Sequence, residues 1–224
     1  MVFGATVGTN AAQSFTEDFS GGVLPAPLEL TVANDGTVVN QVSFGGNNAA
    51  WANVDSYRQY MRTTDSNYSV ADFRFEATIT LNGLSSWGDV FFGMGDATPR
   101  GDWWWEPGRP VIGMSAESGS TYTRELIYDD AGNISDTTRN AGRGGGAGTH
   151  RVRMDWDAET QMATMSIDQN YNGTFVSDNG FTLDGSTVVG GFDASNSHLF
   201  IGGGHGIIID DISIASSLSA FGDW

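Results

Sequence analysis

Residues 72–81, DFRFEATITL, alternate apolar and polar side chains, which is the pattern of a β-strand with one buried face. Residues 150–156, HRVRMDW, show the same alternation, and residues 161–168 follow a short turn as the partner strand of a predicted hairpin. We find no convincing amphipathic helix. The sequence predicts further strands over 89–95, 110–116 and 124–130, and two more within 198–214.

Turn-forming pairs and triplets separate these strands at short intervals, as at Asn34-Asp35-Gly36, Asn82-Gly83 and Asp184-Gly185. Many short strands in a chain of 224 residues favour an all-β fold, a two-sheet antiparallel jelly-roll sandwich. We expect a single domain over 15–216, an N-terminal extension over 1–14 and a C-terminal tail over 217–224.

The charge balance excludes several classes of function. The chain has 27 acidic residues and ten basic residues, all of them Arg, so its net charge is −17. A surface this negative repels phosphate, and we therefore expect no nucleic-acid partner. No apolar run is long enough for membrane insertion. The chain has no Cys, which excludes disulfides and thiolate ligands, and without Lys it has no Schiff-base nucleophile.

Three segments resemble concanavalin A-like (LamG-like) jelly-roll domains. Residues 15–22, FTEDFSGG, resemble the first strand of such domains, residues 150–175 resemble a central hairpin, and residues 209–214, IDDISI, resemble the last strand. The likeness spans about residues 15–214. It implies that the first and last strands are neighbours and that an extended glycan lies on a concave sheet. Lectins, binding modules, glycosidases and polysaccharide lyases share this architecture.

The most unusual local feature is residues 100–109, RGDWWWEPGR. Neighbouring residues of a strand point to opposite faces, so three consecutive Trp cannot all enter one core. Exposed indoles stack on sugar rings, and charged neighbours can bind the hydroxyls. The predicted ligand-binding residues are Asp102, Trp103, Trp104, Trp105, Glu106 and Arg109. The alternative is that the Trp side chains plug a sheet edge.

A second aromatic and basic cluster surrounds Tyr57. In a strand, Arg58 and Tyr60 share one face with Arg62, and we include Tyr57, Arg58 and Tyr60 as a second ligand-binding patch. The alternative is an outer sheet face on which Arg stems cover aromatic rings. His205, in the run GGGHG, is a further candidate because glycines permit close approach of a ligand.

Sequence signals for catalysis are weak. The Glu-x-Asp-x-x-Glu string of the related glucanases is absent, and so are the strings of jelly-roll alginate lyases. Asp102 with Glu106, or Glu117 with Glu125, are the nearest carboxylate pairs, and neither has a diagnostic spacing. We therefore assign no catalytic residue.

Two signals suggest calcium. If the first and last strands are neighbours, Glu17, Asp18, Asp210 and Asp211 come together, and a structural Ca²⁺ would offset their repulsion. Plain surface exposure is the alternative. Residues 168–173, DQNYNG, match the first half of an EF-hand loop, but a hairpin turn at the Asn-Gly pair explains them better.

The sequence therefore predicts a secreted or cell-surface carbohydrate-binding domain that recognises a polysaccharide and whose signal peptide has been removed. A polysaccharide-degrading enzyme on the same fold, and a cell-surface adhesion module, are the alternatives.

Overall fold

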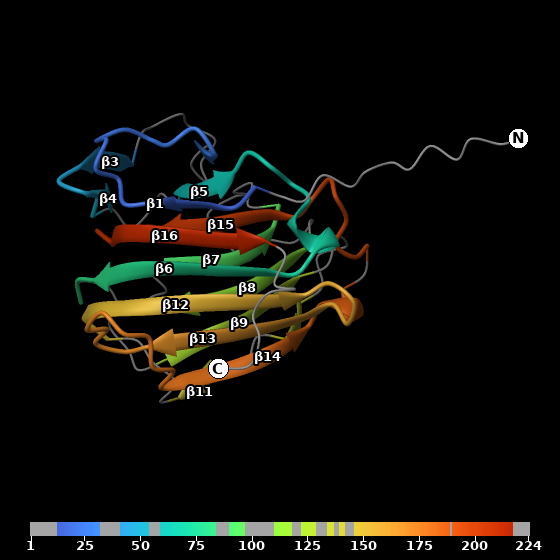
Figure 1. Ribbon diagram of the computed structural model, residues 1–224. Helices are drawn as coiled ribbons and strands as arrows, with labels where there is room; N and C mark the ends of the chain where they lie inside the picture. Colours follow the sequence, from blue (N-terminus) through green and yellow to red (C-terminus); the bar gives the residue numbers. More distant parts are fainter. Residues whose placement is uncertain are drawn as a thin grey trace, which may run out of the picture.

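The computed structural model describes residues 13–31, 41–53, 59–83, 90–96, 110–117, 122–128, 134–136, 139–141, 146–188 and 190–216, the segments between 122 and 141 by their backbone alone. These residues form two antiparallel β-sheets that stack face to face (Figure 1). The all-β sandwich predicted from the sequence is confirmed.

Sheet A is the layer that holds both ends of the described chain. In spatial order its strands are β14 (Asn179–Asp184), β13 (Met162–Asp168), β12 (Gly148–Asp157), β6 (Phe73–Leu81), β16 (Ile208–Ser216), β4 (Asn48–Trp51) and β3 (Val42–Gly45), and β1 (Phe15–Glu17) also pairs with β16.

Sheet B forms the second layer. In spatial order its strands are β10 (Ile134–Asp136), β9 (Tyr122–Tyr128), β8 (Val111–Ala116), β7 (Val90–Gly95), β15 (His198–Gly203), β5 (Gln59–Thr63) and β2 (Leu28–Leu30), and β11 (Arg139–Ala141) also pairs with β9. The helices of the described residues are the single 3₁₀ turns η1 (Tyr68–Val70) and η2 (Gly185–Thr187), and neither is long and apolar enough to cross a membrane.

The core lies between the two sheets and is built by strand alternation. Phe75 of β6 and Phe92 of β7 meet across the layers, with ring centroids 4.3 Å apart. Buried indoles keep their hydrogen bonds: the Nε1–H of Trp156 donates to the Ser69 carbonyl at 3.1 Å, and that of Trp51 to the Gln59 carbonyl at 2.8 Å. The core therefore leaves neither of these indole N–H groups unpaired, which would cost stability.

The first and last described strands are neighbours, as expected. Phe15 lies opposite Ile214 and Glu17 opposite Ile212 in the β1–β16 pairing. On its other side β16 pairs with β6 over its whole length. β16 is thus an interior strand of sheet A, although it is formed by the end of the described chain (Figure 1).

A β-bulge interrupts β16. Ile209 lies opposite Ile79, and Asp211 lies opposite the next residue back, Thr78, so Asp210 is an extra residue in the strand. A bulge of this kind bends a strand and redirects side chains. It explains how two consecutive Asp occur in a strand whose flanking Ile residues are buried.

The Asn172-Gly173 pair does not form the tight hairpin turn predicted from the sequence. β13 and β14 do form a hairpin, but the connection spans 169–178. Two carboxylates stabilise this wide loop from inside: Asp178 accepts from the backbone N–H of Gln169 and Asp168 from that of Val176, both at 2.7 Å. Side-chain acceptors replace the short turn that the sequence suggested.

Candidate functional site

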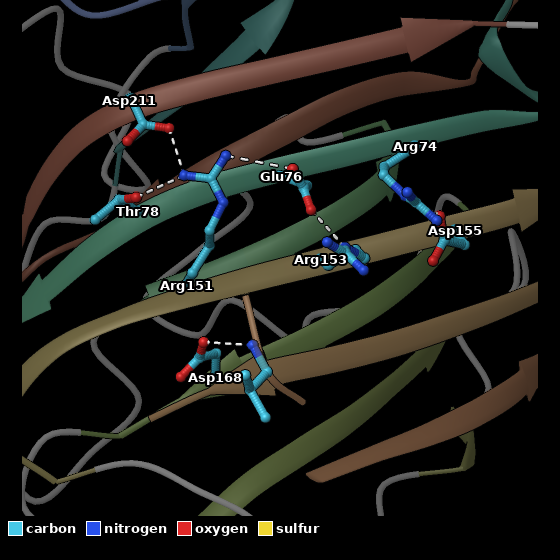
Figure 2. Close-up of polar contacts among 9 residues, drawn as sticks. Arg74, Glu76, Thr78, Arg151, Arg153, Asp155, Asp168 and Asp211 are labelled. Atoms are coloured by element: carbon cyan, nitrogen blue, oxygen red, sulfur yellow. Dashed lines mark hydrogen bonds and ion pairs between the residues drawn. The ribbon is translucent and has the colours of Figure 1, made fainter. Parts of the chain in front are cut away.

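A network of charged side chains covers the outer face of sheet A, which is the face turned away from the core. β6 and β12 pair so that Arg74 lies opposite Asp155 and Glu76 opposite Arg153. The Nε of Arg74 donates to Asp155 at 2.7 Å, and the Nε of Arg153 donates to Glu76 (Figure 2). Opposite charges directly across two strands stabilise their pairing.

Arg151 lies at the centre of this network and is well enclosed, since its side chain is only 11% exposed. Its Nη1 donates to Thr78 Oγ1 at 2.7 Å and to Asp211 Oδ1 at 2.6 Å, and its Nη2 lies 3.3 Å from Glu76 Oε2 (Figure 2). Burial acts to lower the pKa of Arg151, but the hydrogen bonds and charges of Asp211 and Glu76 outweigh burial and raise it. The guanidinium therefore stays charged and links β12, β6 and β16.

The loop 169–178 carries two aromatic rings onto this face. The ring of Tyr171 lies 5.4 Å from the guanidinium carbon of Arg151, and the ring of Phe175 lies 3.6 Å from that of Arg153. Such cation–π contacts are favourable, and more so where water is excluded. The loop thus shields one side of the charged network.

On the other side of the network, where β1 meets β16, there is an open cavity of about 620 Å³. Its lining combines hydroxyl groups, carboxylates, one guanidinium and a few apolar side chains. The lining residues are Thr16, Glu17, Asp18, Ser20, Gly21, Val23, Pro25, Arg151, Asp211, Ile212 and Ser213. The cavity therefore offers hydrogen-bond donors and acceptors beside the exposed apolar surface of Val23, which is 64% exposed.

Three of the four carboxylates predicted to bind calcium line this cavity, and each is already engaged. Glu17 Oε1 accepts from the Phe19 N–H at 2.6 Å, Asp18 Oδ1 accepts from the Ser20 N–H at 2.9 Å, and Asp211 is bound to Arg151. Hydrogen bonds from the side chain and backbone of Ser20 lower the pKa of Asp18.

Asp210, the fourth, does not line the cavity. Burial, and then the charge of Asp211, raise the pKa of Asp210. In the part of the chain that the structure describes, no three Asp, Glu or His groups gather closely enough to hold a metal ion. A guanidinium stands where the sequence suggested a cation, so these four residues do not fit the predicted calcium site.

Tyr60 is the described member of the second predicted patch, since Tyr57 and Arg58 lie outside the described residues. The predicted alternation holds: Met61 enters the core, and Tyr60 lies on the opposite face of sheet B. Tyr60 is only 6% exposed and packs edge-on against Phe91 and Phe200, at centroid distances of 6.2 and 5.8 Å. Its ring is therefore engaged in aromatic packing.

The Trp-rich segment lies outside the described residues: Asp102, Trp103, Trp104, Trp105, Glu106 and Arg109. Its attachment points are described, because it connects β7 with β8. The N–H of Asp96 donates to the Pro110 carbonyl at 3.3 Å, and Arg62 lies 3.5 Å from the Asp96 carboxylate. The segment therefore leaves sheet B beside an Arg–Asp pair.

His205 occupies the turn between β15 and β16. Its φ of +60° lies in the left-handed region, and the residue is only 5% exposed. Its backbone carbonyl accepts from Asn82 Nδ2 at 2.6 Å. The residue shapes a tight connection, as its glycine-rich setting suggests, and its side chain is enclosed.

Sequence reasoning missed Arg151, Arg153 and Glu76 as members of a site. The signal was present, because HRVRMD and FRFEAT carry opposite charges at alternate positions of two predicted strands. The missing information was the register, which places Arg153 opposite Glu76 and no other residue of β6.

Comparison with known proteins adds information on the fold alone. No family model and no curated protein matches the chain. Among solved structures, a Lotus tetragonolobus seed lectin superposes with a TM-score of 0.65 at 11% identity, covering 92% of this chain and 98% of the lectin.

Two further structures show the same likeness. The winged bean acidic lectin, solved with methyl-α-D-galactose, has a TM-score of 0.61 at 12% identity over 92% of this chain and 98% of its own. An endo-1,3-β-glucanase from Streptomyces sioyaensis has a TM-score of 0.56 at 14% identity over 93% and 97%. This protein therefore has the concanavalin A-like jelly-roll fold that its sequence predicted.

Proposed function

We propose that this protein is a non-catalytic carbohydrate-binding domain, secreted or held at the cell surface, that recognises a polysaccharide. The observation that carries the proposal is the cavity of about 620 Å³ at the β1–β16 seam. Sugar sites combine a concave surface with a few fixed polar groups and some apolar contact. Thr16, Ser20 and Ser213 supply hydroxyls, Arg151 and Asp211 supply fixed charges, and Val23 supplies apolar surface.

The charges of the cavity favour a neutral sugar. Three carboxylates line it, and its single guanidinium is already neutralised by Asp211 and Glu76. An anionic uronate or sulfate would lie among carboxylates, and the described lining residues offer it no unpaired cation. The preferred ligand is therefore a polysaccharide of uncharged residues.

Two of the three carboxylates that line the cavity are unsuited to be the acid in glycoside hydrolysis. Hydrolysis needs a protonated carboxyl group opposite a second carboxylate. In the cavity, Asp211 is bound to Arg151, and the pKa of Asp18 is lowered, which keeps it ionised. We therefore favour binding over cleavage, with a glycosidase as the alternative.

The cavity can be closed by one substitution. Gly21 lines it and is exposed, and a Cβ placed there would meet only Val23 Cγ2, at 3.9 Å. Gly21→Trp should therefore fill the cavity without backbone strain. Gly45→Trp is the matched control, because Gly45 is also exposed, has no atom within 4 Å of its added Cβ and lies outside the cavity.

The experiment is affinity electrophoresis through gels that contain neutral or acidic polysaccharides. We expect retardation in a neutral polysaccharide, its loss in Gly21→Trp, and its retention in Gly45→Trp. The Trp-rich segment is tested in parallel with Trp104→Ala: if that variant alone abolishes retardation, the site is the Trp-rich segment and the cavity assignment is wrong. No retardation in any gel, or release of reducing ends, contradicts a binding domain.

Calcium remains a separate hypothesis of the sequence. Addition of EDTA should lower the melting temperature if a structural Ca²⁺ is present, since ligands that bind only the folded state stabilise it. An unchanged melting temperature contradicts that hypothesis and leaves the sugar proposal intact.

A further inference from the structure

His150 joins two loops at one end of sheet A. It lies on β12 and is only 1% exposed. Its Nε2 lies 3.0 Å from the carbonyl of Gly146, and the backbone N–H of Asn170 points at its Nδ1 over 3.4 Å. A carbonyl can only accept and a peptide N–H can only donate. The ring therefore fits both partners only as the neutral imidazole with its proton on Nε2.

The residue after Asn170 contacts the charged network on the outer face of sheet A. Tyr171 donates its backbone N–H to the Thr149 carbonyl at 2.9 Å, and its ring lies over Arg151. Asn170 itself is held at a φ of +57°, in the left-handed region. The placement of the Tyr171 ring thus depends on a backbone that His150 helps to hold.

We propose that His150 is a proton-operated latch for the start of the 169–178 loop. When Nδ1 takes up a proton, two donors face each other, the N–H of the ring and the N–H of Asn170. That hydrogen bond is lost and Asn170 separates from β12. The bond from the Tyr171 N–H to the Thr149 carbonyl is then the remaining contact at the start of the loop, and it opens more often. The rest of the loop stays attached, because Asp178 accepts from the N–H of Gln169 and Asp168 accepts from the N–H of Val176.

The charged surroundings of His150 agree with opening in mild acid. Burial lowers the pKa of His150, against smaller opposing effects of the Gly146 carbonyl and of the Asp168 carboxylate on β13. Arg151 follows on β12 but points to the outer face, and from sheet B the backbone carbonyl of Glu117 accepts from the Gly146 N–H at 2.9 Å. The latch is therefore closed near neutral pH and opens below the ordinary range of imidazole.

Opening of the latch has a consequence for the cavity, and this step rests on the proposed function. Arg151 lines the cavity and has the Tyr171 ring over its other side. Without that ring the guanidinium is freer to move, and the site is less ordered before a ligand arrives. We expect weaker glycan binding at mildly acidic pH than at neutral pH.

Amide hydrogen exchange tests the latch without any glycan, so its result is independent of the proposed function. Protection factors, corrected for intrinsic exchange rates, are measured for 169–178 at about pH 7 and about pH 5. We expect protection at Asn170 and Tyr171 to be lower at about pH 5 than at about pH 7, because the bond from Asn170 to His150 Nδ1 is lost in acid. Protection at Val176 should change less, because Asp168 binds its N–H.

Two variants locate the effect. His150→Asn places an amide oxygen near the position of Nδ1 and does not titrate, so its protection factors should be the same at both pH values. His198→Gln is the control: its imidazole Nδ1 binds the Thr63 carbonyl at 2.6 Å on sheet B, and its loss should leave the pH response intact.

Equal protection of the wild-type loop at both pH values would overturn the latch, and so would a wild-type response in His150→Asn. If His150→Asn does not fold, NMR of the wild type decides. The His150 ring and the Asn170 amide should titrate with one midpoint, and different midpoints contradict the proposal.

Discussion

Arg151 shows what a single side chain does in this fold, because it bonds to residues of two other strands at once. We predict that Arg151→Ala lowers the free energy of unfolding by about 2–3 kcal/mol, since it leaves Asp211 without its cation and Glu76 with Arg153 alone. The loss is smaller than for a fully buried ion pair because the Asp211 side chain is 40% exposed. Urea unfolding measures the change.

Arg74→Ala is the comparison for that experiment. Arg74 and Asp155 are each 29% exposed, and an ion pair open to solvent contributes about 1 kcal/mol or less. An equal loss in both variants would contradict the central role of Arg151.

Histidine titration should make the fold less stable in mild acid. Burial is the main cause that lowers the pKa of both His150 and His198 below the value of 6.5. In the unfolded chain these groups take up protons at a higher pH than in the folded protein, so stability is complete above about pH 6.5 and falls as the pH drops below it.

We predict a lower melting temperature at about pH 5.5 than at about pH 7.5, and a smaller difference in the double variant His150→Asn, His198→Gln. Calorimetry at both pH values checks this. A double variant with the wild-type pH dependence would assign the effect to other groups.

Single residues also show where sequence reasoning ends. The sequence suggested a cation between Glu17 and Asp211, and the fold supplies one from β12, which lies on the far side of β6. To predict that contact one must know both the order of the strands and their register, and the local sequence pattern indicates neither. The turn predicted at Asp184-Gly185 was easier, because Asp184 accepts from the N–H of the Ser two residues later. Asp18 and Asp193, for which no turn was predicted, make the same local contact with Ser20 and Ser195.

Among the elements, the bulge in β16 gives a test of register. Deletion of Asp210 would make Ile209 and Asp211 consecutive, opposite the consecutive pair Ile79 and Thr78, so the pairing with β6 becomes regular. Deletion of Ser213 would instead turn the buried Ile214 toward the outer face. We predict cooperative melting for the first deletion and loss of folding for the second.

Circular dichroism and thermal melting of the two deletions check this prediction. Loss of folding in both would mean that the chain needs the extra residue to close the sheet. Cooperative melting in both would mean that the register is loosely specified.

Element prediction succeeded where alternation extends over several residues. β6, β12 and β13 follow the expected ranges within about two residues. Short strands such as β2 and β3 were not predicted, because three or four residues contain too little periodicity and their pairing partners decide the conformation. The wide β13–β14 loop was missed because its conformation also depends on contacts between residues that are not adjacent in sequence. Asp168 and Asp178 accept from backbone N–H groups eight or nine residues away.

For the whole molecule, the net charge of −17 predicts a response to salt. Like charges repel most in the compact state, and salt screens them beyond about 10 Å at 0.1 M. We predict that the melting temperature rises between about 10 mM and about 500 mM NaCl. Scanning calorimetry at several salt concentrations measures it.

The charged network on sheet A opposes this trend, because salt also weakens its ion pairs. Partly buried pairs such as Arg151 with Asp211 are screened less than free surface charges. A melting temperature that falls with salt would show that the ion pairs outweigh the general repulsion.

The fold class of the whole molecule was predictable because the alternation, the turn signals and the absence of long helical patterns agree with one another. The candidate site was only partly predictable. The residues of the first and last strands were named as neighbours. The cavity between them also depends on the conformation of the 18–25 segment, which involves backbone contacts such as the Gly22 N–H to the Phe19 carbonyl.

The interior position of β16 also bears on synthesis of the chain. β6 and β4 need β16 between them, and β16 is among the last described residues that a ribosome would release. Until then the edges of β6 and β4 that pair with β16 are without their partner strand. The nascent chain must meanwhile be kept from aggregating. Pairing within sheet A is thus expected to be complete only after β16 has left the ribosome.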